Sequence, residues 1–140
     1  MTQRVNLGGE ATGPLQGVRV IDFTAVYSGP IAASILGDQG AQVIKVESAK
    51  GDLMRSGLPQ SQGMPGPFAT MNRNKRSLCL DLQSPEGLDI ARKLIATADV
   101  VMENFRPGVM DRLGLGYDEF KQAQPKLVYA SINGVGATGP

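Results

Sequence analysis

The 140-residue sequence contains no histidine, no tryptophan and a single cysteine, Cys79. Without histidine, the chain lacks the commonest general base and the commonest metal ligand of proteins. Ser–His and Cys–His catalytic pairs are therefore excluded within it. One cysteine permits neither an intrachain disulfide nor a Cys-rich metal site. We predict no metal site and a reducing, cytoplasmic setting.

Long apolar runs are also missing. No stretch reaches the roughly twenty apolar residues of a transmembrane helix, and residues 1–13 lack the apolar core of a signal peptide. We interpret these residues as a flexible lead-in. The chain has 14 basic and 13 acidic residues, a net charge of +1. This balance gives no support for a nucleic-acid or acidic-membrane partner.

Short apolar, β-branched runs alternate with helical patterns. Residues 18–23 and 41–47 predict buried strands on either side of a helix at 31–40, which makes a βαβ unit with a parallel pair. The rhythm then predicts further strands and helices, with Ser84 as N-cap of the first such helix and Pro85 at its first position. We expect an α/β chain with a mainly parallel sheet; the later strands are 77–82, 99–105 and 126–134, and the later helices 84–98, 106–116 and 117–125.

Residues 48–72 interrupt this rhythm. They are rich in Gly, Pro, Ser and Gln, show no period, and carry no charge from Ser56 to Asn72. A loop of this length in a compact domain is usually functional or disordered. We predict an irregular loop here and no domain boundary, because the alternation of strand and helix resumes afterwards.

Two basic groups lie near predicted strand ends. Arg73, Lys75 and Arg76 form one, which either meets phosphate or is a solvated basic turn. Arg106 and Arg112 form the other, beside a short helix. They are either an anion site or surface charge.

Other polar residues near strand ends have two interpretations. Asp22, Glu47 and Glu103 could in principle be catalytic carboxylates, but we favour structural hydrogen bonds or ion pairs. Cys79 alternates with leucines in a predicted strand, and we interpret it as a packing residue rather than a nucleophile.

Gly134, Gly136 and Gly139 match the G-x-G-x-x-G dinucleotide fingerprint after a predicted strand. That fingerprint needs a following helix and an acidic residue about twenty positions on. Neither follows Gly139 in this sequence, so we predict no dinucleotide site there. The turn at 22–30 lacks this fingerprint, which argues against NAD and leaves a ligand loop or a plain connection.

Five segments, in this order and spacing, resemble the family III CoA-transferases, the CaiB/BaiF group that includes formyl-CoA transferase and α-methylacyl-CoA racemase. Together they run from Pro14 to Pro140 and read PLQGVRVIDFT, SGPIAASILGDQGAQVIKVE, NRNKRSLCLDLQSPEGL, ADVVMENFRPGVMDRLGLGYD and LVYASINGVGATGP.

The resemblance implies a fold and an activity. It implies a Rossmann-like domain with helices on both faces of the sheet, within a larger protein whose two chains interlock like rings in a homodimer. Members transfer CoA between an acyl-CoA and a small carboxylic acid through an aspartate nucleophile, which is covalent catalysis by a carboxylate. CoA is then a substrate, and no covalently bound cofactor is expected.

The resemblance also implies which residues contact CoA. Arg106 and Arg112 would serve the phosphates, and Phe105 would flank adenine or pantetheine. Several relatives carry arginine where this chain has Ser48, and a serine at that position would give up the stacking or phosphate contact of an arginine. The implied set is Tyr27, Ser28, Ser48, Leu80, Asp81, Leu82, Gln83, Asn104, Phe105, Arg106 and Arg112.

The catalytic aspartate of the family lies beyond the segment that matches Pro140. We therefore interpret residues 14–140 as the amino-terminal part of the large CoA-binding domain, inactive alone. Two alternatives remain open. One is an acyl-CoA racemase, which shares this part, and the other is an inactive fragment that binds CoA or assembles with another chain.

Overall fold

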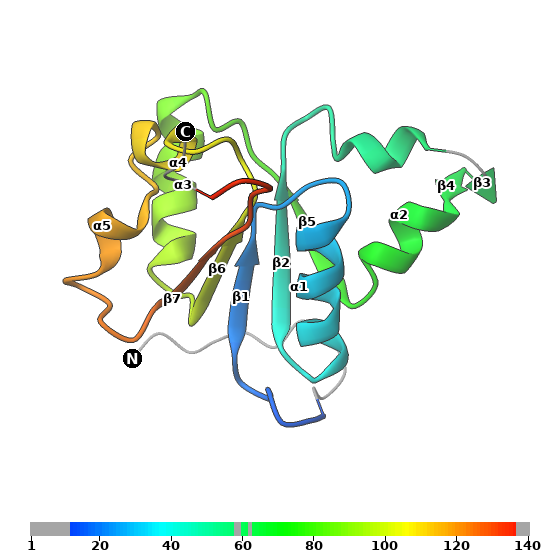
Figure 1. Ribbon diagram of the computed structural model, residues 1–140, viewed down its shortest axis with the longest axis horizontal. Helices are drawn as coiled ribbons and strands as arrows, with labels where there is room; N and C mark the ends of the chain where they lie inside the picture. Colours follow the sequence, from blue (N-terminus) through cyan, green and yellow to red (C-terminus); the bar gives the residue numbers. More distant parts are fainter. Residues whose placement is uncertain (1–11, 58–59, 62, 137–140) are drawn as a thin grey trace.

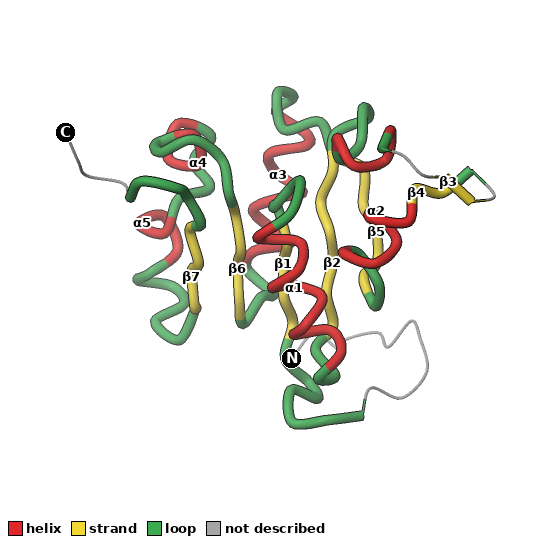
Figure 2. Tube along the Cα trace, turned by 45° about the vertical axis from the view of Figure 1, so that its right-hand side comes forward, coloured by secondary structure: helices red, strands yellow, loops and turns green. Residues whose placement is uncertain are grey.

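A computed structural model describes residues 12–57, 60–61 and 63–136. Its centre is a sheet of five strands in the order β5-β2-β1-β6-β7, and every neighbouring pair is parallel. Figure 2 shows this order across the sheet. The predicted parallel α/β sheet is therefore confirmed. The strands are β1 (Arg19–Asp22), β2 (Gln42–Glu47), β5 (Lys75–Cys79), β6 (Val100–Glu103) and β7 (Val128–Ser131).

Helices cover both faces of the sheet, as expected (Figure 1). Successive strand residues point to opposite faces, so Val20 and Ile21 of β1 belong to two different cores. Val20 packs with Ala33 of α1 (Ser28–Asp38). Ile21 packs with residues of three helices on the other face, which are α3 (Pro85–Ile95), α4 (Val109–Arg112) and α5 (Tyr117–Phe120).

Helix α3 begins as the sequence predicts. Ser84 is the N-cap, and its hydroxyl accepts a hydrogen bond of 3.0 Å from the backbone N–H of Gly87. Pro85 occupies the first turn, where its missing N–H costs nothing. Ala91 and Ile95, which are spaced to lie on one face, are fully buried. The helices predicted at 106–116 and 117–125 are present but shorter.

The prediction of an irregular loop at residues 48–72 is wrong. This segment forms a 3-10 helix η1 (Leu53–Ser56), a hairpin of β3 (Gln60–Ser61) and β4 (Met64–Pro65), and a helix α2 (Gly66–Met71). Phe68 of α2 is buried, and the Arg55 guanidinium lies 4.1 Å from its ring centre. Elements of two to six residues are too short to show a period, which is why the sequence pattern missed them.

Strand β5 corrects two further expectations. It begins at Lys75 rather than at Ser77, because Lys75 pairs in parallel with Val43 of β2. The side chain of Lys75 is buried, so this residue does not belong to a solvated turn. Cys79 is exposed, so the packing interpretation is wrong. It ends a strand that, among the described residues, has a neighbouring strand on one side only.

Residues 1–11 and 137–140 lie outside the described part of the chain. This applies to most of the predicted lead-in and to Gly139 of the fingerprint. Gly134 and Gly136, which follow β7, are exposed.

Candidate ligand-binding site

A cavity of about 370 Å³ lies at the carboxyl edge of the sheet. Its residues come from the ends of β1, β2 and β5 and from the segment after β6. In open parallel α/β sheets, ligands bind at this edge, where neighbouring strands send their connections to opposite faces. β1 and β6 are such a pair, because the connection after β1 leads to α1 and that after β6 to α4. The lining residues are Phe23, Thr24, Ala25, Lys45, Val46, Glu47, Ser48, Gly51, Asp52, Leu80, Asp81, Leu82, Gln83, Phe105, Val109 and Leu113.

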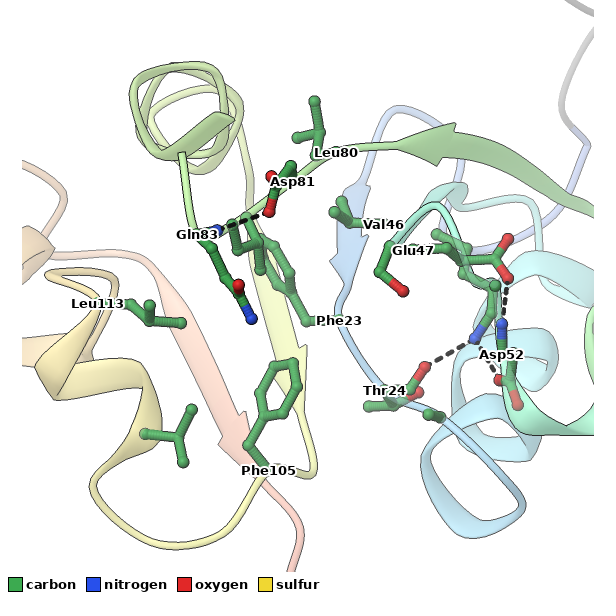
Figure 3. Close-up of a pocket in the computed structure, with 16 residues that line it drawn as sticks. Phe23, Thr24, Val46, Glu47, Asp52, Leu80, Asp81, Gln83, Phe105 and Leu113 are labelled. Atoms are coloured by element: carbon green, nitrogen blue, oxygen red, sulfur yellow. Dashed lines mark hydrogen bonds and ion pairs between the residues drawn. The ribbon is translucent and has the colours of Figure 1, made fainter. Parts of the chain in front are cut away.

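The two sides of the cavity differ in polarity: one combines apolar side chains with an amide, and the other is polar. Figure 3 shows Phe105, Leu113 and Gln83 on one side, and Thr24, Glu47 and Asp52 on the other. Such a mixture suits a ligand with a flat or aliphatic part and a few hydrogen-bonding groups.

Six of the eleven predicted contact residues line this cavity. They come from three segments that are far apart in the sequence, and the fold brings them together: Ser48, Leu80, Asp81, Leu82, Gln83 and Phe105.

The other five predicted residues lie around it. Tyr27 and Ser28 are exposed at the start of α1. Arg106 lines a neighbouring cavity of about 320 Å³. Arg112 is exposed on α4, the helix whose Val109 lines the first cavity. No ion pair engages either arginine within the described part of the chain.

Asn104, the fifth, joins two loops. Its side-chain oxygen accepts from the N–H of Ala25 at 2.9 Å, and its Nδ2 donates to the C=O of Ala25 at 2.8 Å. Both hydrogen-bonding functions of this amide thereby hold the loop after β1 against the loop after β6.

The turn at 80–83 is shaped by the start of α3. Asp81 accepts from the N–H of Gln83 at 2.9 Å through its side chain. Gly87 lies so close that a Cβ there would be 1.9 Å from the Asp81 carbonyl oxygen. Only glycine permits this close approach of helix and turn.

Glu47 is the centre of a polar network at the end of β2. It accepts from the N–H of Asp52 at 2.9 Å, from the Ser77 hydroxyl at 2.7 Å, and from Arg55 at 2.6 Å and 2.8 Å. Burial would raise the pKa of Glu47. The hydrogen bonds from Arg55, Ser77 and Asp52 outweigh it and lower that pKa from 4.5 to about 2. Glu47 is thus a structural anion.

Glu103 also has a structural environment. It accepts from the N–H of Phe105 at 2.9 Å and from the hydroxyl of Ser131. Asp22 likewise pairs with Lys75 at 2.9 Å. The structural interpretation of these carboxylates is confirmed.

The basic group at 73–76 divides between two structural roles. Lys75 donates to Asp22, to the C=O of Pro30 and to the Asn72 side chain. Burial lowers the pKa of Lys75, and Asp22 opposes that effect. Arg73 pairs with Asp38 instead. Lys75 and Arg73 therefore do not form the phosphate-binding group that was considered from the sequence.

Lys45 and Asp52 are functional-site candidates that were not predicted from the sequence. Their side chains form an ion pair of 2.9 Å at the cavity and are only 2% and 1% exposed. A signal existed for Lys45, because it is a charged residue flanked by apolar residues inside a predicted buried strand. For Asp52 there was none, since its partners lie up to 26 residues away.

The described residues hold no group of three or more His, Cys, Asp or Glu side chains that could bind a metal ion. Within the same residues, no helix is both long and apolar enough to cross a bilayer.

The strand order and the cavity define the class of this protein. Counted along the sheet, its parallel strands run third, second, first, fourth and fifth in chain order, with helices on both faces and a cavity at the carboxyl edge. This is a Rossmann-like α/β domain.

The chain belongs to CoA-transferase family III, whose model matches residues 15–140. It is 44% identical over 135 residues to the succinyl-CoA–L-malate CoA-transferase beta subunit of Chloroflexus aurantiacus, covering 95% of this chain and 33% of that protein. It is 44% identical over 127 residues to the formyl-CoA:oxalate CoA-transferase of Rhodopseudomonas palustris, covering 89% of this chain and 30% of that protein.

A solved structure of a CaiB/BaiF family protein from Brucella suis matches with a TM-score of 0.86 and 42% identity. The match covers 92% of this chain and 35% of that one. The chain therefore spans about a third of the length of the relatives it matches.

Proposed function

We propose that this chain is the CoA-binding, amino-terminal part of an enzyme that moves CoA between an acyl-CoA and a small carboxylic acid. One observation carries the proposal. In a member of family III, Ser48, the turn at 80–83 and Phe105 line one cavity at the carboxyl edge of the sheet. The family relatives named above are CoA-transferases.

In this proposal, the described residues bind and orient CoA. Phe105, Leu113 and Leu82 offer apolar surface to the adenine or the pantetheine arm. Arg106 and Arg112 offer guanidinium groups to the phosphates, which they match in shape and charge. The other proposed contacts are Tyr27, Ser28, Ser48, Leu80, Asp81, Gln83 and Asn104.

The covalent step belongs to a carboxylate outside these 140 residues. Its oxygen attacks the thioester carbonyl, the C–S bond breaks, and the CoA thiolate leaves while an acyl anhydride forms. The thiolate then attacks the enzyme carbonyl of that anhydride, which releases the first acid and leaves an enzyme–CoA thioester. The acceptor carboxylate repeats these two steps in reverse. We also propose that the longer protein is an interlocked homodimer.

The test uses the longer protein that contains this sequence. Calorimetry should detect CoA binding, and a mass-spectrometric assay should detect transfer of CoA from an acyl-CoA to a free acid. Absence of binding at millimolar CoA would contradict the proposal. Racemisation of a 2-methylacyl-CoA without transfer would favour the racemase instead.

The arginines allow a sharper prediction. Arg106→Ala and Arg112→Ala should each weaken CoA binding about tenfold to a hundredfold, because a hydrogen bond to a charged group contributes about 1.5–3 kcal/mol. Arg73→Ala is the matched control, since Arg73 already pairs with Asp38. Calorimetric affinities at fixed salt measure all three. Equal affinities for Arg112→Ala, Arg106→Ala and the control would contradict these assignments.

A further inference from the structure

The loop after β1 is held by side chains rather than by a backbone ladder. The N–H of Thr24 donates to Asp22 at 2.9 Å, and the C=O of Thr24 accepts from Lys45 Nζ at 2.7 Å. Asn104 binds both backbone groups of Ala25. Consecutive backbone groups are thus fixed by residues from three different segments.

Val26, the next residue, has an unfavourable conformation. Its φ is +73°, in the left-handed region that β-branched residues rarely adopt. Its N–H donates to the Asp52 carboxylate, 3.2 Å from one oxygen and 3.3 Å from the other. A strained residue persists only where its surroundings determine it, and such residues gather at functional sites.

Asp52 is placed to impose this conformation. It is itself fixed by the buried ion pair with Lys45 and by its own N–H, which donates to Glu47. Its carboxylate also caps η1 by accepting from the N–H of Met54 at 3.0 Å. Asp52 therefore connects the segment after β2 to the loop after β1 at the wall of the cavity.

We propose that Asp52 is a positioning residue. By holding the N–H of Val26, and with Asn104 holding Ala25, it fixes the loop at 24–28 in the conformation that receives CoA. The proposal rests on the proposed function for the ligand. Its benefit is preorganisation, because a loop that is already ordered loses less conformational entropy on binding.

The first measurement is hydrogen exchange of the ligand-free longer protein. Asp52→Ala should speed exchange in peptides covering 24–28 about tenfold or more, and leave peptides of β1 at 19–22 unchanged. Asp52→Asn should fall between wild type and Asp52→Ala, because it keeps one oxygen acceptor. Both variants remove the counter-ion of Lys45. The difference between their exchange rates therefore measures the effect of the oxygen acceptor that Asp52→Asn retains. Asp118→Ala, which removes an exposed carboxylate of α5, is the matched control.

The second measurement is CoA affinity at a temperature where every variant is folded. Asp52→Ala should weaken CoA binding about tenfold or more, and Asp52→Asn less. A purely structural role would lower the melting temperature and leave the affinity of the folded protein unchanged. Wild-type affinity in Asp52→Ala, or unchanged exchange at 24–28, would overturn the proposal.

If Asp52→Ala does not fold, Asn104→Ala gives the same test, because it releases Ala25 and leaves the Lys45–Asp52 pair in place. It should speed exchange at 24–28 without ligand, which loss of a direct CoA contact would not do; unchanged exchange overturns the proposal. Failure of wild type to bind CoA contradicts the proposed function, whereas binding that is insensitive to the loop contradicts only this inference.

Discussion

At the scale of single residues, buried charges fix the carboxyl edge of the sheet. Lys75 and Asp22 pair at 2.9 Å with side chains 2% and 0% exposed, and Lys45 and Asp52 pair at the same distance. A buried ion pair adds little net stability, but removing one partner leaves an uncompensated charge. The pairs therefore fix geometry more than they add stability.

Lys75→Ala should be strongly destabilising for this reason. It would strand the Asp22 carboxylate, so we expect a loss of about 3–5 kcal/mol in the free energy of unfolding. Lys93→Ala is the control, because Lys93 forms an exposed pair with Asp89 and should change stability by less than about 0.5 kcal/mol. Urea denaturation measures both. An equally small loss of unfolding free energy in Lys75→Ala and Lys93→Ala would show that the buried pair is dispensable.

The lowered pKa of Glu47 predicts that the stability of the folded chain depends on pH. Its pKa is about 2 in the folded chain against 4.5 in the absence of its partners. A lowered pKa gives stability that is complete above the unfolded value and is lost as the pH falls toward the folded one. The melting temperature should therefore fall between about pH 4.5 and pH 2.

Glu47→Gln should melt below wild type at pH 7, and the gap should narrow as the pH is lowered toward 2, because glutamine does not titrate. Calorimetry at pH 7, 4 and 3 measures this. Glu119→Gln, an exposed change on α5, should leave the melting curve near that of wild type. A constant gap for Glu47→Gln would contradict the role of its hydrogen bonds.

At the scale of elements, α1 begins against the loop that it follows. Gly29 lies in its first turn, and a Cβ there would be 2.3 Å from the Cβ of Thr24. Thr24 is 1% exposed and has no room to move. The position of α1 therefore depends on a glycine that the periodic pattern did not single out.

Gly29→Ala should cost about 1–3 kcal/mol by overpacking. Gly134→Ala is the matched control, because nothing lies within 4 Å of a Cβ at Gly134. Thermal melts of both variants measure the difference. A melting temperature of Gly29→Ala equal to that of the control would mean that Thr24 and α1 can separate without cost.

At the scale of the whole molecule, the sheet has two open edges. β5 and β7 each pair on one side only within the described chain, and Val128 of β7 is 58% exposed. Ile31 and Ile35, one turn apart on α1, are 43% and 46% exposed. Open edges with apolar side chains favour association.

We therefore expect the 140-residue chain on its own to self-associate or to require a partner segment. Light scattering coupled to size exclusion, over a range of concentrations, measures this. Val128→Lys should reduce association through the β7 edge, because an edge charge opposes pairing of strands. A monodisperse monomer with a cooperative melt would contradict the expectation.

Local patterns were enough to predict some elements. The strand, helix and cap signals predicted β1, β2 and α3 with its Ser84 cap, because burial and capping leave marks at fixed spacing. Family resemblance supplied the predicted contact residues, six of which line the cavity, Ser48 and Phe105 among them. Neither source indicated Asp52, whose partners in the loop after β1, in β2 and in η1 are set by the fold.

The sequence by itself determined an α/β chain with a parallel sheet, the absence of histidine chemistry and the family. The tertiary structure decided which polar residues meet. Lys75, at the start of β5, reaches Asp22 at the end of β1, and Lys45 of β2 reaches Asp52 in the segment after that strand. The order and register of the parallel strands bring these residues together. The tertiary structure also decided the left-handed conformation of Val26, since the carboxylate of Asp52, from another segment, accepts a hydrogen bond from its N–H. Spacing along a chain carries local preference, whereas contacts between distant segments depend on the register of the whole sheet.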